Sequence, residues 1–187
     1  MKLSILIPII ERHKEFANKL IDSIEQQSQF YGDIEIATCE NETDNIGAKR
    51  NKLLAASSGQ YVAFIDADDR ISNDYINRLM WGIKLGVDCC SLKGSYSVDG
   101  VFNGVFEHSS KYKEWKTTTN EIKYERYPNH LNCIKADIAK QFKFPEINHG
   151  EDHKWAEQIH KSGLLKTEHY IDSIIYYYDK RTIQPKG

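Results

Sequence analysis

The stretch Tyr61-Val-Ala-Phe-Ile-Asp-Ala-Asp-Asp69 is an apolar strand that runs directly into acidic residues. Side chains two positions apart on an extended backbone share a face, so Asp66 and Asp68 are expected to project together where the strand ends. Two carboxylates about 4 Å apart repel by roughly 4 kcal/mol at a protein-like effective dielectric constant. A divalent cation, Mg2+ or Mn2+, would offset this repulsion, because both ions prefer oxygen ligands and commonly join carboxylates to substrate phosphates. The stretch therefore predicts a metal and diphosphate site.

A purely structural role is the alternative for these acids, because Asp-rich strand ends also form turns and helix caps. Asp69 is assigned to such a role. Asp74 is assigned to it as well, since it directly precedes the helical pattern of residues 75–85.

Length, charge and cysteine usage bound the class of protein. The chain has 187 residues, enough for one domain with a real core and too few for two comfortable ones. A formal net charge of -2 gives no global field that points to nucleic acid or membrane. The four cysteines lack C-x-x-C spacing and fit buried thiols of a reducing compartment. The first apolar run is too short for a signal peptide or membrane span, so a cytoplasmic protein is expected.

Strand and helix patterns alternate through the first half of the chain. Residues 3–7, 33–38 and 61–65 predict strands, and residues 16–27 and 48–56 between them carry helical spacing. Strands separated by helices predict right-handed crossovers and a mostly parallel central sheet with helices on both faces. Ligands bind beyond the carboxyl ends of the strands in such α/β sheets. The acidic stretch is therefore expected to face a crevice at that edge.

The second half carries different patterns and predicts a small antiparallel portion of the same domain. A hairpin around Asp99-Gly100 is expected because Asp-Gly is a favoured two-residue connection. A helix is expected to end at Gly163, a common C-terminal residue. The hairpin is expected at residues 88–107 and an irregular, substrate-facing segment at residues 111–127. A strand with a short helix is expected at residues 132–140, the longer helix at residues 151–162 and a last strand at residues 173–178.

Several motifs together resemble one family of enzymes. These motifs are LSILIPII at the N-terminus, Asn45-Ile-Gly-Ala-Lys-Arg-Asn51, AASSGQYVAFIDADD, and Glu151-Asp152 after Gly150. In order and spacing they resemble the GT-A fold glycosyltransferases of family 2. The resemblance covers essentially the whole chain and is closest to compact phage and bacterial members. It implies a Rossmann-like GT-A fold in a single domain, residues 1–187. Residues 1–69 would form the nucleotide-binding half and residues 70–187 the acceptor-binding half.

The resemblance also implies which residues hold the donor, a nucleotide-diphosphate sugar and most of all a UDP-sugar. The matched positions lie in the loops after the first two strands, at the start of the second helix and at the first acid of the Asp-x-Asp motif. They are Pro8, Glu11 or Arg12, Glu40 or Asn41, Lys49 and Arg50, and Asp66. Cys-Glu-Asn-Glu replaces the more usual Asp-Asp-Gly-Ser after the second strand, so Glu40 and Asn41 both stay open. A solvated helix face is the alternative for Lys49 and Arg50.

The remaining implied roles concern the metal ion and catalysis. Asp68 would bind the ion together with Asp66, and His130 is a candidate third ligand whose alternative is a structural or acceptor contact. Asp152 would act as the general base that deprotonates the acceptor hydroxyl, with Glu151 beside it in acceptor binding. Stabilisation of the helix dipole is the alternative for both acids. One displacement would invert the anomeric centre.

The acceptor and two other protein classes stay open at this point. A glycan acceptor and a hydroxymethylated DNA base are both considered; DNA would need a basic groove and a flipped base. The candidates for that groove are Lys111, Lys113, Lys116, Lys123 and Arg126. A non-catalytic nucleotide-sugar-binding protein is disfavoured by Asp152, and a haloacid-dehalogenase-like phosphatase by Arg70 and the strand order.

One aromatic cluster allows two interpretations. Tyr112, Trp115, Tyr124 and Tyr127 could stack on a sugar or a base, or could cover the hydrophobic edge of a small sheet. The sequence does not decide between them.

Overall fold

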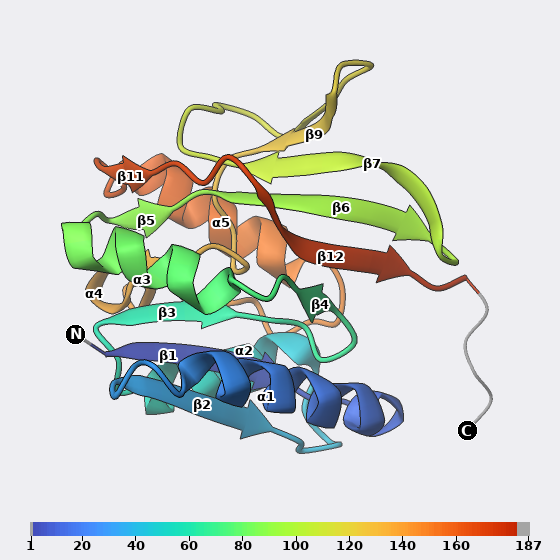
Figure 1. Ribbon diagram of the computed structural model, residues 1–187, viewed down its shortest axis with the longest axis vertical. Helices are drawn as coiled ribbons and strands as arrows, with labels where there is room; N and C mark the ends of the chain where they lie inside the picture. Colours follow the sequence, from blue (N-terminus) through green and yellow to red (C-terminus); the bar gives the residue numbers. More distant parts are fainter. Residues whose placement is uncertain (1, 183–187) are drawn as a thin grey trace.

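The computed structural model describes residues 2–182, which form two six-stranded sheets with helices packed against the first (Figure 1). The strands of the first sheet are β1 (Leu3–Pro8), β2 (Ile34–Cys39), β3 (Tyr61–Phe64), β5 (Cys89–Cys90), β10 (Ile134–Lys135) and β11 (Glu168–His169). Those of the second sheet are β4 (Arg70–Ile71), β6 (Leu92–Val98), β7 (Val101–His108), β8 (Lys116–Thr117), β9 (Ile122–Arg126) and β12 (Ile174–Lys180). The helices are η1 (Glu11–His13), α1 (Lys14–Ser28), α2 (Ile46–Ala56), α3 (Tyr75–Leu85), α4 (Ala136–Ala139) and α5 (Glu151–Ser162).

The first sheet has the strand order β11-β5-β10-β3-β1-β2 and confirms the predicted α/β class. β1 pairs in parallel with β2 on one side and β3 on the other, so Pro8 lies opposite Cys39 and Leu6 opposite Phe64. β10 is antiparallel to both of its neighbours, β3 and β5. The carboxyl ends of the three parallel strands therefore meet at one edge, as predicted.

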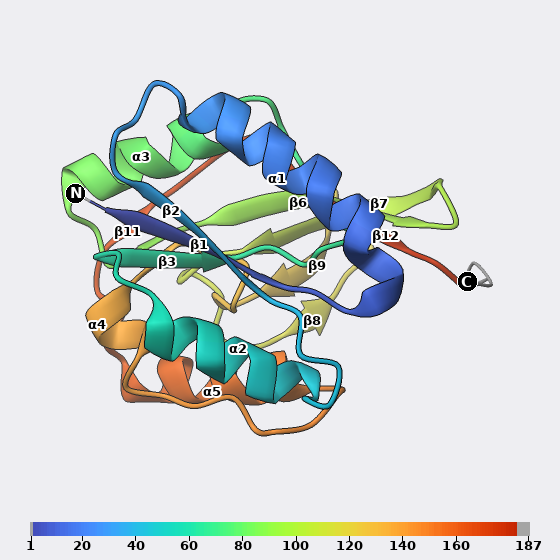
Figure 2. The same cartoon turned by 90° about the horizontal axis from the view of Figure 1, so that it is seen from below.

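Helices cover both faces of the first sheet, with α1 and α3 on one side and α2, α4 and α5 on the other (Figure 2). β1 divides its side chains between these two layers because successive residues of a strand point to opposite faces. Ile5 and Ile7 belong to the core that includes Leu20 of α1, and Leu6 belongs to the core that includes Trp155 of α5. Both faces are apolar, which explains why β1 is aliphatic apart from Ser4 and Pro8.

The second sheet, with order β4-β12-β6-β7-β9-β8, is larger than the small antiparallel portion that the sequence suggested. The predicted hairpin is present as β6 and β7, with Asp99 at a positive φ of 48° in its turn. β12 pairs with β6 in parallel and returns the chain to the middle of the sheet.

Residues 111–127 are not irregular throughout, as the sequence analysis expected. They contain β8 and β9, and β9 pairs in parallel with β7. Every residue of β9 is only half-buried, so this strand shows no apolar alternation of its own. Its order comes from pairing with a distant strand, which local patterns do not reveal.

Two helix starts position the acidic edge. Asn45 caps α2 by accepting a hydrogen bond from the Ala48 N–H at 2.9 Å, so the helix begins two residues before its predicted start. α5 lies between Gly150 and Gly163, both at positive φ, and has the predicted bounds. Because glycine adopts such backbone angles without steric cost, these two residues define both ends of the helix.

The cysteines are free thiols, and Cys89, Cys90 and Cys133 are buried as predicted. Within residues 2–182, no helix combines the length and apolar character that a membrane span requires.

Candidate active site

The acidic stretch after β3 forms a turn and does not continue as an extended strand. The Asp69 N–H donates to the Asp66 carbonyl at 3.0 Å, which closes the turn directly after the strand. The two carboxylates that were expected to share one face therefore contact different partners. Asp66 lies against Arg50 and His130, and the Asp68 carboxylate lies 3.3 Å from Nδ1 of His13. The expectation was wrong because the two-residue alternation applies only while the backbone stays extended.

Arg50 joins the acidic turn to the N-terminus of α5. Its side chain is 4% exposed; Nη2 lies 2.6 Å from Asp66 Oδ1, and Nη1 donates to Glu151 Oε1. The solvated helix face considered for Arg50 is thus wrong. A planar guanidinium with several donors suits this task, because it can serve two carboxylates at once.

The pKa values of the two carboxylates that Arg50 joins are shifted in opposite directions. Burial by itself raises the pKa of Asp66, but the charge of Arg50 and the contact with His130 hold that pKa well below its usual range. For Glu151, burial prevails over the attraction of Arg50, and the pKa is raised. Asp66 is therefore kept as an anion, while Glu151 is a buried partner of Arg50.

His130 lies between Asp66 and Asp152. Its Nε2 is 3.5 Å from Asp66 Oδ2 and its Nδ1 is 3.9 Å from Asp152 Oδ2. The ring is buried, and neither nitrogen has a hydrogen-bond partner among the described residues. Asp152, in the first turn of α5, keeps 30% of its side chain exposed. The structure thus places the proposed base and the first acid of the motif beside the same buried ring.

The loops after β1 and β2 meet at Lys14. Its Nζ lies 2.5 Å from Glu11 Oε2 and 3.7 Å from Glu40 Oε2. Both acids, which are candidates for binding the nucleotide sugar, therefore pair with the same lysine. Arg12 is exposed on η1 beside them, and Pro8 is buried at the end of β1.

Two other donor candidates have structural partners. The Asn41 side chain accepts hydrogen bonds from the backbone N–H and hydroxyl of Thr43, which shapes the turn after β2. Lys49 is buried and donates through Nζ to the Ile9 carbonyl at 2.5 Å. It holds the first loop in place from behind, and the solvated face considered for it is wrong.

A pocket of about 400 Å³ opens between the acidic edge and the second sheet. Asp66, Asp69, His130 and Asp152 form one end of its lining, and aromatic side chains supply much of the rest. Trp115 and Tyr124 of the aromatic cluster line it, whereas Tyr112 bonds to Glu107 and Tyr127 stacks on His160. The lining residues that the sequence analysis did not single out are Tyr96, Phe106, His108, Asn129, Leu131 and Tyr178. The pairing of β6, β7 and β12 gathers four of them, and Asn129 and Leu131 come from the segment between β9 and β10.

A second pocket of about 380 Å³ lies between α1 and the acidic turn. Asp68 and Asp69 line it together with three basic residues, Lys19, Arg70 and Arg181. Arg181 and His13, which contacts Asp68, were both missed in the sequence. A basic residue close in sequence to the Asp-x-Asp motif could have been recognised as a partner for its acids. Neither Arg181 nor His13 is close to the motif along the chain.

The donor set around the turn fits a hard cation, although the side chains alone do not form a complete site. No group of three or more His, Cys, Asp or Glu side chains within residues 2–182 is arranged to hold a metal ion. Asp66 is held as an anion, and Asp68 keeps 26% of its side chain exposed. Mg2+ is typically bound by one or two carboxylates with substrate phosphates and water, so two acids suffice when a diphosphate supplies the other ligands.

The five basic residues considered for a DNA-binding groove differ in their partners and exposure. Lys111 pairs with the buried Glu107, and Arg126 lines the pocket of about 400 Å³. Lys113 and Lys116 are exposed, and Lys123 donates to Asn103.

Comparisons with known proteins agree with this architecture. The chain matches the family model described as glycosyl transferase family 2 over residues 14–144. It therefore belongs to glycosyl transferase family 2. No curated protein matches the chain in sequence.

Among solved structures, the chain is similar to TarS of S. aureus. The complex of TarS residues 1–349 with UDP-GlcNAc gives a TM-score of 0.69 at 19% identity, covering 98% of this chain and 60% of that one. The UDP complex gives 0.66 at 18% identity, covering 96% and 60%, and another TarS structure gives 0.65 at 16%, covering 96% and 37%. At such identities the likeness establishes the GT-A fold. This chain spans 60% or less of the length of these structures.

Proposed function

We propose that this chain transfers a sugar from a UDP-sugar to an acceptor hydroxyl, with inversion at the anomeric carbon. The observation that carries the proposal is the pocket of about 400 Å³ in which Asp66 and Asp152, 86 positions apart in the chain, line one end. A UDP-sugar is favoured because TarS, which is similar in fold, was crystallised with UDP-GlcNAc and with UDP.

On the donor side, charge complementarity supports a diphosphate beside Asp68. Lys19, Arg70 and Arg181 line the second pocket and would attract the phosphates. Asp66 and Asp68 are the residues that would hold a divalent ion, Mn2+ or Mg2+. Such an ion supplies Lewis-acid stabilisation of negative charge on a leaving diphosphate.

On the acceptor side, Asp152 would take the proton of the attacking hydroxyl; its partial exposure and its position in the pocket lining support this role. A positioned general base contributes typically about 100-fold to 10,000-fold in rate. The Arg50–Glu151 pair fixes the first turn of α5 relative to Asp66, so it acts as a positioning pair for Asp152. His130, between Asp66 and Asp152, would help to hold their separation and is the remaining candidate metal ligand.

The proposal predicts a split between donor binding and turnover. Asp68→Ala should abolish UDP binding that depends on Mn2+, because it removes a carboxylate ligand, whereas Asp152→Asn should keep binding and lose turnover at least 100-fold. Calorimetry with UDP and Mn2+, and release of UDP from UDP-GlcNAc, would measure the two effects.

Asp172→Asn is a matched control, since Asp172 is an exposed acid that pairs with Lys93 away from both pockets. Unchanged UDP binding in Asp68→Ala, or unchanged turnover in Asp152→Asn, would contradict the proposal. Binding of UDP-sugars without any turnover by the unmodified protein would favour the non-catalytic alternative.

A further inference from the structure

Arg126 is a cation that lines the pocket of about 400 Å³ and forms no ion pair with any described carboxylate. It ends β9, and its Nη1 donates to the backbone carbonyls of Lys116 at 2.6 Å and Glu125 at 2.8 Å. The guanidinium lies 5.2 Å from the ring centre of Trp115 and 5.6 Å from that of Tyr124. Among the described residues, no carboxylate lies within ion-pairing distance of it. Arg126 is half-buried, and its Nε and Nη2 donate to no described residue, so these donors are available to a ligand in the pocket.

Two further polar groups of the same pocket lack partners. His108 Nδ1 and Trp115 Nε1 are buried and form no hydrogen bond with any described residue. His108 is 5% exposed, and burial lowers its pKa to about 3, so the ring is neutral. A buried polar group without a hydrogen bond costs about 1 to 3 kcal/mol, and native proteins keep few of them. A ligand rich in oxygen atoms would satisfy these groups.

The aromatic wall of the pocket is suited to sugar rings. Tyr96 stacks on Tyr178 with ring centres 5.3 Å apart, and Tyr124 meets Tyr96 edge-on at 5.4 Å. These residues come from three strands of the second sheet, so their positions are set by strand pairing. Pockets of a few hundred Å³ with apolar walls and a few placed polar groups are typical of small-molecule sites.

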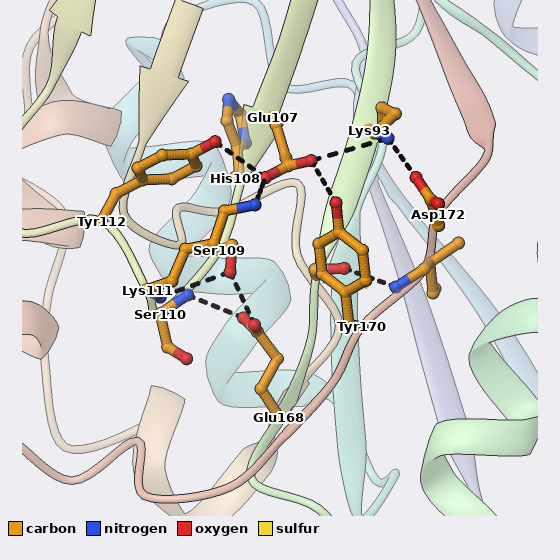
Figure 3. A network of polar contacts seen from close by, with 12 residues as sticks. Lys93, Glu107, His108, Ser109, Ser110, Lys111, Tyr112, Glu168, Tyr170 and Asp172 are labelled. Atoms are coloured by element: carbon orange, nitrogen blue, oxygen red, sulfur yellow. Dashed lines mark hydrogen bonds and ion pairs between the residues drawn. The ribbon is translucent and has the colours of Figure 1, made fainter. Parts of the chain in front are cut away.

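A polar network behind the pocket holds its wall in place (Figure 3). Glu107 is buried on β7 next to His108; it pairs with Lys111 and accepts hydrogen bonds from Tyr112 at 2.9 Å and Tyr170 at 2.6 Å. The segment that leads from β7 to Trp115 is therefore anchored. The same network neutralises Lys111, which leaves Arg126 as the uncompensated charge of this wall.

We infer that Arg126 binds an anionic group, a carboxylate or a phosphate, on a saccharide acceptor whose hydroxyl faces Asp152. This inference rests on the proposed function and names the class of acceptor. The acceptor side is assigned because Asp152 lines this pocket, with Asp66 at the edge toward the donor, whereas Asp68 and the basic residues proposed to attract the diphosphate line the second pocket. A saccharide is favoured over DNA because one arginine supplies the charge here, whereas a duplex needs a row of cations along its phosphates.

Glycan binding tests the inference without any donor. An array would carry uronate-containing, phosphate-containing and neutral oligosaccharides together with duplex DNA bearing hydroxymethylcytosine, and calorimetry would follow for the best glycan. We expect the protein to bind either the uronate-containing or the phosphate-containing oligosaccharides. The affinity for these acidic glycans should fall at least tenfold in Arg126→Gln. Arg126→Lys should recover part of the affinity because it keeps the charge without the planar fork. Lys113→Gln removes an exposed charge nearby and should match the unmodified protein.

The outcomes separate the inference from the function on which it rests. Preference for neutral glycans or DNA, absence of acidic-glycan binding, or an unchanged affinity in folded Arg126→Gln would overturn the inference. Thermal unfolding would establish that the variants fold. A failure of the proposed function would appear separately, as absence of UDP and Mn2+ binding by the unmodified protein.

Discussion

Arg50 joins carboxylates that lie 16 and 101 positions away along the chain. Such a buried ion cluster is costly to break, because removing one partner leaves an uncompensated charge, typically at about 3 to 5 kcal/mol. In this protein the cluster also sets the distance between the acidic turn and the helix that carries Asp152. Stability and site geometry therefore depend on the same residue.

The buried His108, which lines the pocket of about 400 Å³, predicts an acid-sensitive fold. The folded-state pKa of His108 is about 3, below the ordinary value of 6.5, so the unfolded chain binds the proton more readily between these values. The stability that depends on neutral His108 is present above pH 6.5 and is lost as the pH falls toward 3. We expect His108→Gln to remove on the order of 2 kcal/mol of the stability difference between pH 7 and pH 5.

Urea unfolding at both pH values would measure this difference. His149→Gln replaces an exposed histidine and is the control. An identical pH dependence in His108→Gln and the unmodified protein would count against the predicted origin.

At the residue scale, the sequence revealed the acids but not their partners. Asp66, Asp68 and Asp152 could be singled out because they lie at a strand end and a helix start. The pairing of Arg50 with Glu151 could not, since it depends on how α2 and α5 pack. The roles assigned to these residues in the reaction stay predictions.

At the scale of elements, α2 approaches the segment before α5 so closely that only glycine fits between them. A Cβ on Gly47 would lie 1.9 Å from the Pro145 carbonyl oxygen, which belongs to the backbone and cannot rotate away. We expect Gly47→Ala to destabilise the fold by about 1 to 3 kcal/mol, the usual cost of overpacking. Gly32→Ala is the matched control, because no atom lies within 4 Å of its Cβ.

Chemical unfolding of the two variants would test this contact. Equal midpoints for Gly47→Ala and Gly32→Ala would show that the segment moves aside at no cost. Weaker UDP binding in Gly47→Ala would indicate in addition that the contact helps to place Arg50.

The accuracy of the sequence analysis differed between elements for a physical reason. α3 and α5 have the bounds predicted for them, because apolar residues recur at helical spacing and glycines follow both helices. β9 was missed, since its residues are half-buried and its partner β7 is distant in sequence. Local patterns record burial within an element, whereas pairing between edge strands is a property of the whole sheet.

At the scale of the molecule, Tyr176 connects the two sheets at the acidic turn. Its hydroxyl donates to Asp69 Oδ2 at 2.7 Å and accepts from the Asp66 N–H at 3.2 Å. Tyr176→Phe keeps the ring and leaves both groups without this partner, so we expect a loss of about 1 to 3 kcal/mol in stability. We also expect weaker binding of UDP with Mn2+, because the turn that carries Asp68 would loosen.

Tyr177→Phe is the control, since its hydroxyl has no hydrogen bond among residues 2–182 and its ring stays beside Arg70. Thermal unfolding and calorimetry on both variants would measure the two effects. If Tyr176→Phe behaved like Tyr177→Phe, the turn would be held by the backbone alone.

The interior position of β12 also matters during synthesis on the ribosome. This strand lies between β4 and β6, although the chain makes it more than seventy residues after either of them. A nascent chain that still holds residues 174–180 inside the exit tunnel has a gap in its second sheet, and its acidic turn lacks Tyr176. The parallel strands β1, β2 and β3 can therefore pair early, but the acidic turn would lack its Tyr176 contact until translation has passed this strand.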